Sequence, residues 1–399
     1  MEKEISYKTY KVLVEAISDF CVSANQDFNI KSSEYLINGK FAYIIENSSV
    51  VKMLEDGVIS ENELEDIKAF LQAHPEYLEK YFGDYKLELA SEYDNNIGII
   101  RFWRFSELAD NSYRERYAIP ASTVKGILKT GFLSFFLNSA DYKYGRVGNK
   151  KRLQLMLLKP NNLKDKAKNT QQLYEILINQ NDVKKGVHLY KLVGENTWKE
   201  INEIDNIILS TENMLFRNII CSDLVVKDGR FVVKKVNRIS RVNKKSATLQ
   251  YIELAQKGSL FEGEIKEVNH LKDLPVNMLS FLYYKDLNYP ENLNLIDICR
   301  EGLKKFSKKI IEAERKHFAQ RIKDLNPQNS EFYDTLLSEV ENEEIIIKLG
   351  RGGIHAKSFM SFDSNNLSKQ DFFPYTINVD DADKLPIGWV KLRIEEEKR

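Results

Sequence analysis

The order of strand-type and helix-type segments most constrains the fold of this 399-residue chain. Residues 10–14 and 41–45 have strand patterns, and Asn38-Gly39 between them favours a turn. Residues 60–82 follow with helical spacing and many carboxylates. Strands and helices therefore interleave without the regular rhythm of a parallel sheet. This order predicts an α+β fold with largely antiparallel sheets.

The second half of the chain continues this mixture. Residues 224–236 carry Asp228-Gly229 between β-branched runs, which predicts a β-hairpin. Residues 295–321 predict the longest helix, because apolar side chains recur on one stripe: Ile296, Cys299, Leu303, Phe306, Ile310 and Ala313. Further strands are expected at residues 259–265, 344–349 and 388–394. Residues 141–170 are polar and lysine-rich and predict a mobile insertion, and residues 171–180 predict a helix.

An abrupt helix start lies at residues 119–129. Pro120 suits the entrance of a helix, and Ser122 or Thr123 can cap its free N–H groups. Ser122, Lys125 and Lys129 share one side at spacings of three and four. Free N–H groups, the helix dipole and two lysines together favour an anion site. An ordinary capped core helix with solvated lysines is the other interpretation of the same pattern.

Two further features favour binding of a polyanion. Residues 234–245 hold six basic and no acidic residues: Lys234, Lys235, Arg238, Arg241, Lys244 and Lys245. The loop Gly350-Arg351-Gly352-Gly353 allows close backbone approach to a ligand, and Arg351 with Lys357 supplies charge for phosphate. His355 could act as a general acid or base, or stack on a base. A solvent-exposed face would also explain the basic run, and a flexible turn would also explain the glycine loop.

Aromatic residues near these features could stack on single-stranded bases, although each is also a core candidate. They are Phe102, Trp103, Phe105, Phe231 and Phe359. By contrast, residues 55–94 carry twelve acidic residues against three lysines. This segregation creates local fields in a chain whose formal net charge is zero.

Several kinds of chemistry lack a sequence pattern here. The five histidines are far apart and no Cys-x-x-Cys occurs, so no zinc site is expected, and no spacing of carboxylates indicates another metal site. Asp380, Asp381 and Asp383 form the nearest candidate metal cluster, but an acidic turn is the simpler interpretation. No nucleophile elbow or P-loop occurs. Three scattered cysteines and the lack of a long apolar run favour a cytoplasmic protein with reduced thiols.

Residues 119–129 resemble the helix entrance of the RAMP proteins of CRISPR systems. Four more segments are similar to RAMP motifs: residues 215–223, 252–261, 349–358 and 385–392. Their order over nearly the whole chain resembles the family of fifth subunits of type III-A (Csm) complexes. Two departures occur. Residues 18–25 lack the glycines and the histidine of the family's N-terminal turn, with Cys21, Ser23 and Asn25 at those positions, and Ala121 replaces a usual glycine.

The resemblance implies two ferredoxin-like (RRM-related) domains with antiparallel sheets and helices on one face. We place the N-terminal domain at residues 1–258, with insertions at about 55–95 and 141–200, and the C-terminal domain at residues 259–399. The resemblance implies a non-catalytic subunit without a cofactor that caps the 3′ end of the guide RNA (crRNA) and supports its maturation. Implied partners are the crRNA, the target RNA, neighbouring backbone and small helical Csm subunits, and host nucleases that trim the guide.

The resemblance assigns backbone contacts to Ser122, Thr123, Lys125 and Lys129, and to Arg351, Gly352 and Gly353. Two other functions stay open. One is a metal-independent endoribonuclease that cuts CRISPR repeats, with His355 or His188 as the base. The other is a protein-interaction platform in which the acidic segment at residues 55–94 recruits a basic partner such as a trimming nuclease.

Overall fold

A computed structural model of the chain describes residues 7–23, 29–91, 93, 97–109, 112–138, 216–217, 219–240, 246–268, 295–325, 328–350 and 376–397. It also describes the backbone of five strands between residues 141 and 200. The fold is mixed α+β with largely antiparallel sheets, as predicted.

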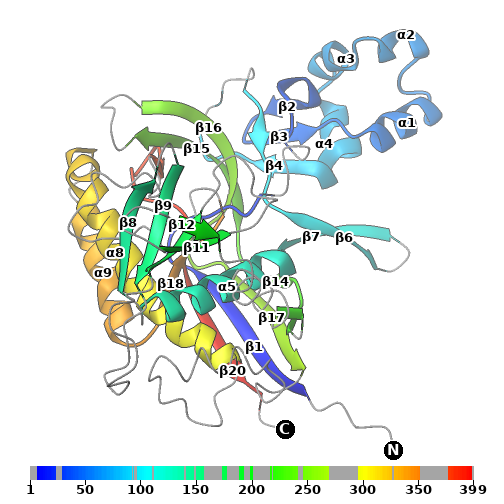
Figure 1. The fold of residues 1–399 in the computed structure, drawn as a ribbon. Coiled ribbons are helices and arrows are strands. Elements are labelled where there is room, and N and C mark those ends of the chain that lie inside the picture. Colours follow the sequence, from blue (N-terminus) through cyan, green and yellow to red (C-terminus); the bar gives the residue numbers. More distant parts are fainter. Residues whose placement is uncertain are drawn as a thin grey trace, which may run out of the picture.

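The largest sheet has eight strands and joins both ends of the chain. Its order is β18-β20-β1-β17-β14-β7-β6, and β13 also pairs with β17. In Figure 1, β1 (Tyr7–Ala16) lies between β20 (Trp389–Glu396) and β17 (Leu260–Val268), antiparallel to both. The other members are β6 (Arg104–Ala109), β7 (Ser112–Ile119), β13 (Ile219–Cys221), β14 (Leu224–Asp228) and β18 (Ile345–Lys348). Strands from both sides of residue 258 thus share one sheet, and the domain division there stays a prediction.

Two helices lie against this sheet: α5 (Ala121–Asn138) and α8 (Leu295–Leu325) (Figure 1). The Leu295 N–H at the start of α8 donates to Glu267 on β17, 3.0 Å away. The two helices cross closely, since a Cβ on Gly131 of α5 would lie 2.3 Å from the Cys299 carbonyl oxygen of α8. The predicted apolar stripe of α8 is confirmed, with all six of its residues at most 3% exposed. Helix α9 (Asn329–Glu341) follows.

The predicted hairpin at residues 224–236 is wrong in its pairing. β14 pairs with β17 and β7, whereas β15 (Phe231–Ser240) pairs with β16 (Ser246–Ala255) and β19 (Thr376–Asp380). The hairpin is formed by β15 and β16. The chain bends before β15 and after β16, so that β14 and β17 continue its two strands into the large sheet. Gly229 allows the bend before β15, because a Cβ there would lie 2.7 Å from Ser259 Oγ, between β16 and β17. β5 (Ile99–Ile100) adds a parallel edge to β16.

Residues 32–88 form a lobe that stands away from the large sheet (Figure 1). Its sheet is β2 (Tyr35–Asn38), β3 (Phe41–Ile44) and β4 (Lys86–Glu88). Its helices are α1 (Asn47–Glu55), α2 (Glu61–Leu64), α3 (Ile67–Ala73) and α4 (Glu76–Phe82), with 3-10 turns at Ser32–Glu34 and Gly83–Tyr85. The helical prediction for residues 60–82 is thus confirmed as three short helices. Met53, Leu71 and Phe82 are fully buried in the lobe's own core.

Five antiparallel strands form a further sheet within residues 141–200. They are β8 (Asp141–Val147), β9 (Lys150–Met156), β10 (Leu173–Leu177), β11 (His188–Leu192) and β12 (Trp198–Glu200). The predicted helix at residues 171–180 is wrong, because β10 lies there. Among the helices of the described residues, none is long and apolar enough to cross a membrane.

Candidate nucleic-acid interface

Helix α5 begins directly after Pro120, as the sequence predicts. Its apolar residues Val124, Ile127, Leu128 and Phe132 are buried. Ser122 is exposed, and Thr123, Lys125 and Lys129 are half-buried. The Thr123 N–H donates to the Pro120 carbonyl, 2.8 Å away, which closes the first turn. The predicted start of the helix is therefore confirmed, whereas Ser122 and Thr123 lie within its first turn and not at the capping position before it. The role of the polar side of the helix in RNA binding stays a prediction.

An acidic residue that the sequence analysis did not single out caps this helix. The Ala121 N–H donates to Asp223 Oδ1, 2.7 Å away. Asp223 reaches the helix because the strand is interrupted between β13 and β14, opposite Gly263 of β17. A Cβ on Gly263 would lie 2.7 Å from the Asp223 carbonyl oxygen. This carboxylate already provides the negative charge that a helix start favours, so an RNA phosphate would have to be held by the lysines.

Both lysines of α5 lie over the segment at residues 216–221. Lys125 Nζ donates to the Ile219 carbonyl oxygen, 3.1 Å away. Lys129 Nζ lies 5.7 Å from the centroid of the Phe216 ring, within the range of a cation–π contact. Residues 119–129 and 215–223 resemble two separate RAMP motifs, and in the structure these two segments are in contact. Their contact positions two ammonium groups on the same side of α5.

The basic run on β15 is only partly available to a ligand. Lys234 Nζ lies 2.8 Å from Asp19 Oδ2 and 2.7 Å from Asp380 Oδ2. Burial opposes its charge, but the bonds to these two carboxylates outweigh burial and raise the pKa of Lys234. Lys235 Nζ lies 5.9 Å from the Tyr93 ring centroid, and Arg238 is exposed. Arg241, Lys244 and Lys245 lie outside the described residues.

The glycine loop begins against the segment at residues 18–23. Gly350 has φ +70°, and a Cβ there would lie 1.7 Å from the Cys21 carbonyl oxygen. The close approach that this glycine permits is thus to the protein's own backbone. Gly388 N–H also donates to the Asp19 carbonyl, 2.8 Å away. Five predicted site residues lie outside the described part of the chain: Arg351, Gly352, Gly353, His355 and Lys357.

The aromatic candidates separate into core and partly exposed residues. Phe102 is 1% exposed and packs with Phe20 and Phe261, so it is a core residue. Trp103 and Phe105 are half-buried, with ring centroids 6.0 Å apart. Phe231 is half-buried and stacks on Tyr117 at 3.6 Å. Phe359 lies outside the described residues.

The acidic turn at Asp380 is held by lysines. Asp380 pairs with Lys234, and Asp381 Oδ1 lies 2.6 Å from Lys384 Nζ. Bonding to Lys384 lowers the pKa of Asp381. Across the described residues, no group of three or more His, Cys, Asp or Glu side chains is arranged to hold a metal ion.

No family model matches the chain, and no curated protein matches it. Solved structures do. A chain of a Csm–crRNA–target RNA ternary complex of a type III-A CRISPR-Cas system has a TM-score of 0.55 at 12% identity, covering 96% of this chain and 100% of that one. Csm5 of T. onnurineus has a TM-score of 0.55 at 13% identity, covering 95% and 99%. The chain therefore shares the fold of these proteins over almost its whole length, which confirms the resemblance at the level of fold.

Proposed function

We propose that this chain is a non-catalytic, crRNA-binding subunit of a type III-A CRISPR (Csm) complex that caps the 3′ end of the guide. The observation that supports this most is the fold shared with Csm5 over 95% of the chain. Its partners in this proposal are the crRNA, the target RNA, and neighbouring backbone and small helical subunits. It would support guide maturation, with trimming nucleases as further partners.

The contacts of α5 suggest how such a subunit holds RNA without reading its sequence. Lys125 and Lys129 present positive charge beside residues 216–221, and Ser122 is exposed on the same side of the helix. Ammonium groups attract the phosphate backbone and carry no base information. A site of this kind suits guides whose spacer sequences differ.

Replacing Lys125 and Lys129 together by alanine is expected to weaken guide binding about equally for different spacer sequences. Two lost phosphate contacts should lower the slope of log K against log salt by about 1.4 for a single strand. Filter binding over a salt series measures both quantities. The double change Lys40→Ala and Lys52→Ala, at two exposed lysines of the lobe, is the matched control. Equal affinities for wild type and the α5 variant would remove α5 from the interface.

The alternative of a metal-independent ribonuclease has a separate test. We expect no discrete cleavage when the pure chain is incubated with repeat RNA in EDTA. His188 lies in β11, and His355 lies outside the described residues. Product sizing on denaturing gels is the measurement. Cleavage at one position that disappears in His188→Ala or His355→Ala would replace the proposal with the enzymatic one.

A further inference from the structure

Over β1 and β17, one face of the eight-stranded sheet packs into the core, and the other, called the wet face below, is partly exposed to water. On β1, Val12 and Val14 are fully buried, whereas the side chain of Lys11, the residue before Val12, is 37% exposed. On β17, Phe261 is fully buried and the side chain of its neighbour Glu262 is 33% exposed. Antiparallel sheets often face water on one side, so the wet face alone carries no function.

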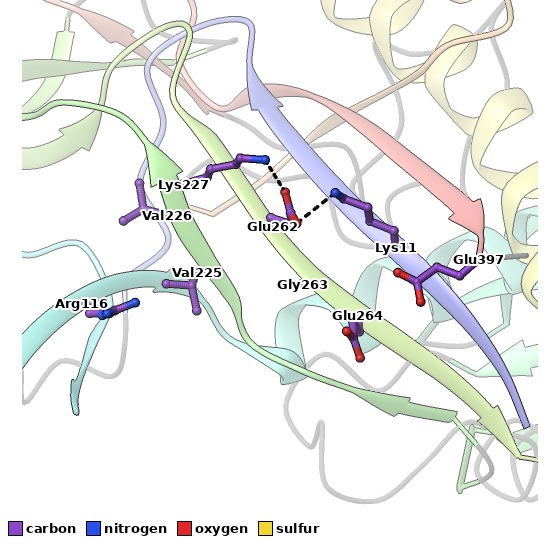
Figure 2. Close-up of a pocket in the computed structure, with 9 residues that line it drawn as sticks. All are labelled: Lys11, Arg116, Val225, Val226, Lys227, Glu262, Gly263, Glu264 and Glu397. Carbon is purple, nitrogen blue, oxygen red and sulfur yellow. Dashed lines mark hydrogen bonds and ion pairs between the residues drawn. The ribbon is translucent and has the colours of Figure 1, made fainter. Parts of the chain in front are cut away.

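A hollow of about 380 Å³ interrupts this wet face (Figure 2). The backbone of Gly263 on β17 lines it, and Val225 of β14 adds an apolar surface. Lys11 and Lys227 reach Glu262 from two sides, each with its Nζ 3.0 Å from a carboxylate oxygen. Two lysines share one carboxylate, so this middle part of the hollow keeps a net charge of +1.

The remaining charged groups lie on opposite sides of the hollow. Figure 2 shows Arg116 on the side of β7, and Glu397 on the far side beyond β1. Glu264 lines the hollow from β17, with a side chain that is 52% exposed and lies 3.7 Å from Lys266 Nζ. Arg116 is 51% exposed and pairs with Glu107 at 2.6 Å. The hollow thus has one positive and one negative side.

This pattern favours a protein over a nucleic acid. Three cations and three carboxylates line the hollow, so a phosphate backbone gains no net attraction there. An apolar surface between opposite charges matches a polypeptide, which can carry an acidic, an apolar and a basic side chain in one short segment. Complementary charges across such a surface give specificity and fix orientation.

We propose that the hollow docks a protein subunit of the complex through a mixed-charge segment. That segment presents a carboxylate to Arg116 and a basic side chain to Glu264 and Glu397. The choice of partner rests on the proposed function, because a subunit of a ribonucleoprotein complex needs a protein-facing surface as well as an RNA-facing one.

The test is co-purification from cells that express the chain with the other subunits and the guide. Arg116→Glu, and separately Glu264→Lys with Glu397→Lys, should lower recovery of the chain in the complex by about tenfold or more, since like charges would then face each other. Guide affinity of the free chain should stay within about twofold, because these residues lie outside the α5 site. Lys308→Glu on α8 and Glu61→Lys on α2 are charge-reversal controls at exposed positions, and thermal melting checks folding.

A photocrosslinking side chain at position 227 gives an independent result. It should form a crosslink to a protein subunit, and the same group at position 308 should not. Crosslinks from position 227 to RNA, or undiminished assembly of both charge variants, would overturn the inference. A wild-type chain that binds guide but joins no complex refutes the docking inference alone. A chain that assembles normally but binds no guide refutes the proposed RNA role and leaves the docking inference intact.

Discussion

Replacing Lys348 by alanine is expected to destabilise the folded protein by about 3–5 kcal/mol. Lys348 ends β18 and its Nζ lies 2.6 Å from Glu314 Oε2 on α8, with both side chains at most 3% exposed. The same carboxylate accepts hydrogen bonds from Tyr333 OH at 2.9 Å and Trp389 Nε1 at 3.2 Å. Removing the lysine would leave a buried carboxylate without its cation.

Chemical denaturation measures this effect, and a more exposed ion pair between β20 and the residue before β18 offers a control. Arg393 on β20 pairs with Glu344 at 3.2 Å, but its side chain is 43% exposed. Arg393→Ala should therefore cost less than about 1 kcal/mol. The paired change Lys348→Met with Glu314→Gln should recover much of the loss, because no uncompensated charge remains. Burial lowers the pKa of Lys348, although the neighbouring Glu314 carboxylate favours its charge. Equal losses for Lys348→Ala and Arg393→Ala would contradict this account.

Gly350→Ala is expected to lower the free energy of unfolding by about 3 kcal/mol or more, the second large effect. The new Cβ would lie 1.7 Å from the Cys21 carbonyl oxygen and 2.6 Å from the Cys21 carbonyl carbon. These are backbone atoms, so the two segments must separate. Strain from the left-handed backbone at φ +70° adds about 1–2 kcal/mol. Because Gly350 is the first residue of the predicted phosphate loop, the change should also shift the start of that loop.

A substitution at Gly57 separates the contact with Cys21 from the strain of the left-handed backbone. Gly57 has φ +68°, nearly that of Gly350, but a Cβ there would meet nothing within 4 Å. Gly57→Ala should therefore cost only the backbone term, about 1–2 kcal/mol. The denaturant midpoints of both variants give the difference in their free energies of unfolding when the denaturant slopes are equal. If the two substitutions cost the same, the contact between residues 21 and 350 does not constrain the fold.

Sequence patterns predicted the elements whose signals are local. The stripe of α8 was identified because its six apolar residues repeat at helical spacing, and all six are buried. The start of α5 was identified because proline marks helix entrances, although the cap is Asp223 and not the hydroxyl of Ser122 or Thr123 that the pattern predicted. The strand at β18 is four consecutive buried residues, and its position was also predicted.

Features that depend on distant residues could not be predicted in the same way. The Asp228-Gly229 signal was real, but the packing of Gly229 on Ser259 converts a turn into a bend between two sheets. Lys234 belongs to a basic run in the sequence, yet Asp19 and Asp380 come to it from both ends of the chain. Asp223 could have been noticed, because Ser222-Asp223 interrupts an apolar run; its position at the start of α5 depends on Gly263.

The measurement that tests the central claim most directly is the sizing and sequencing of RNA that copurifies with the chain from its native cells. The account predicts a narrow set of short RNAs made of CRISPR spacers, with the 3′ region protected by this subunit and with no preference among spacer sequences. Random cellular RNA, or no RNA from a chain that is correctly folded, would contradict the claim that this protein is a guide-RNA subunit.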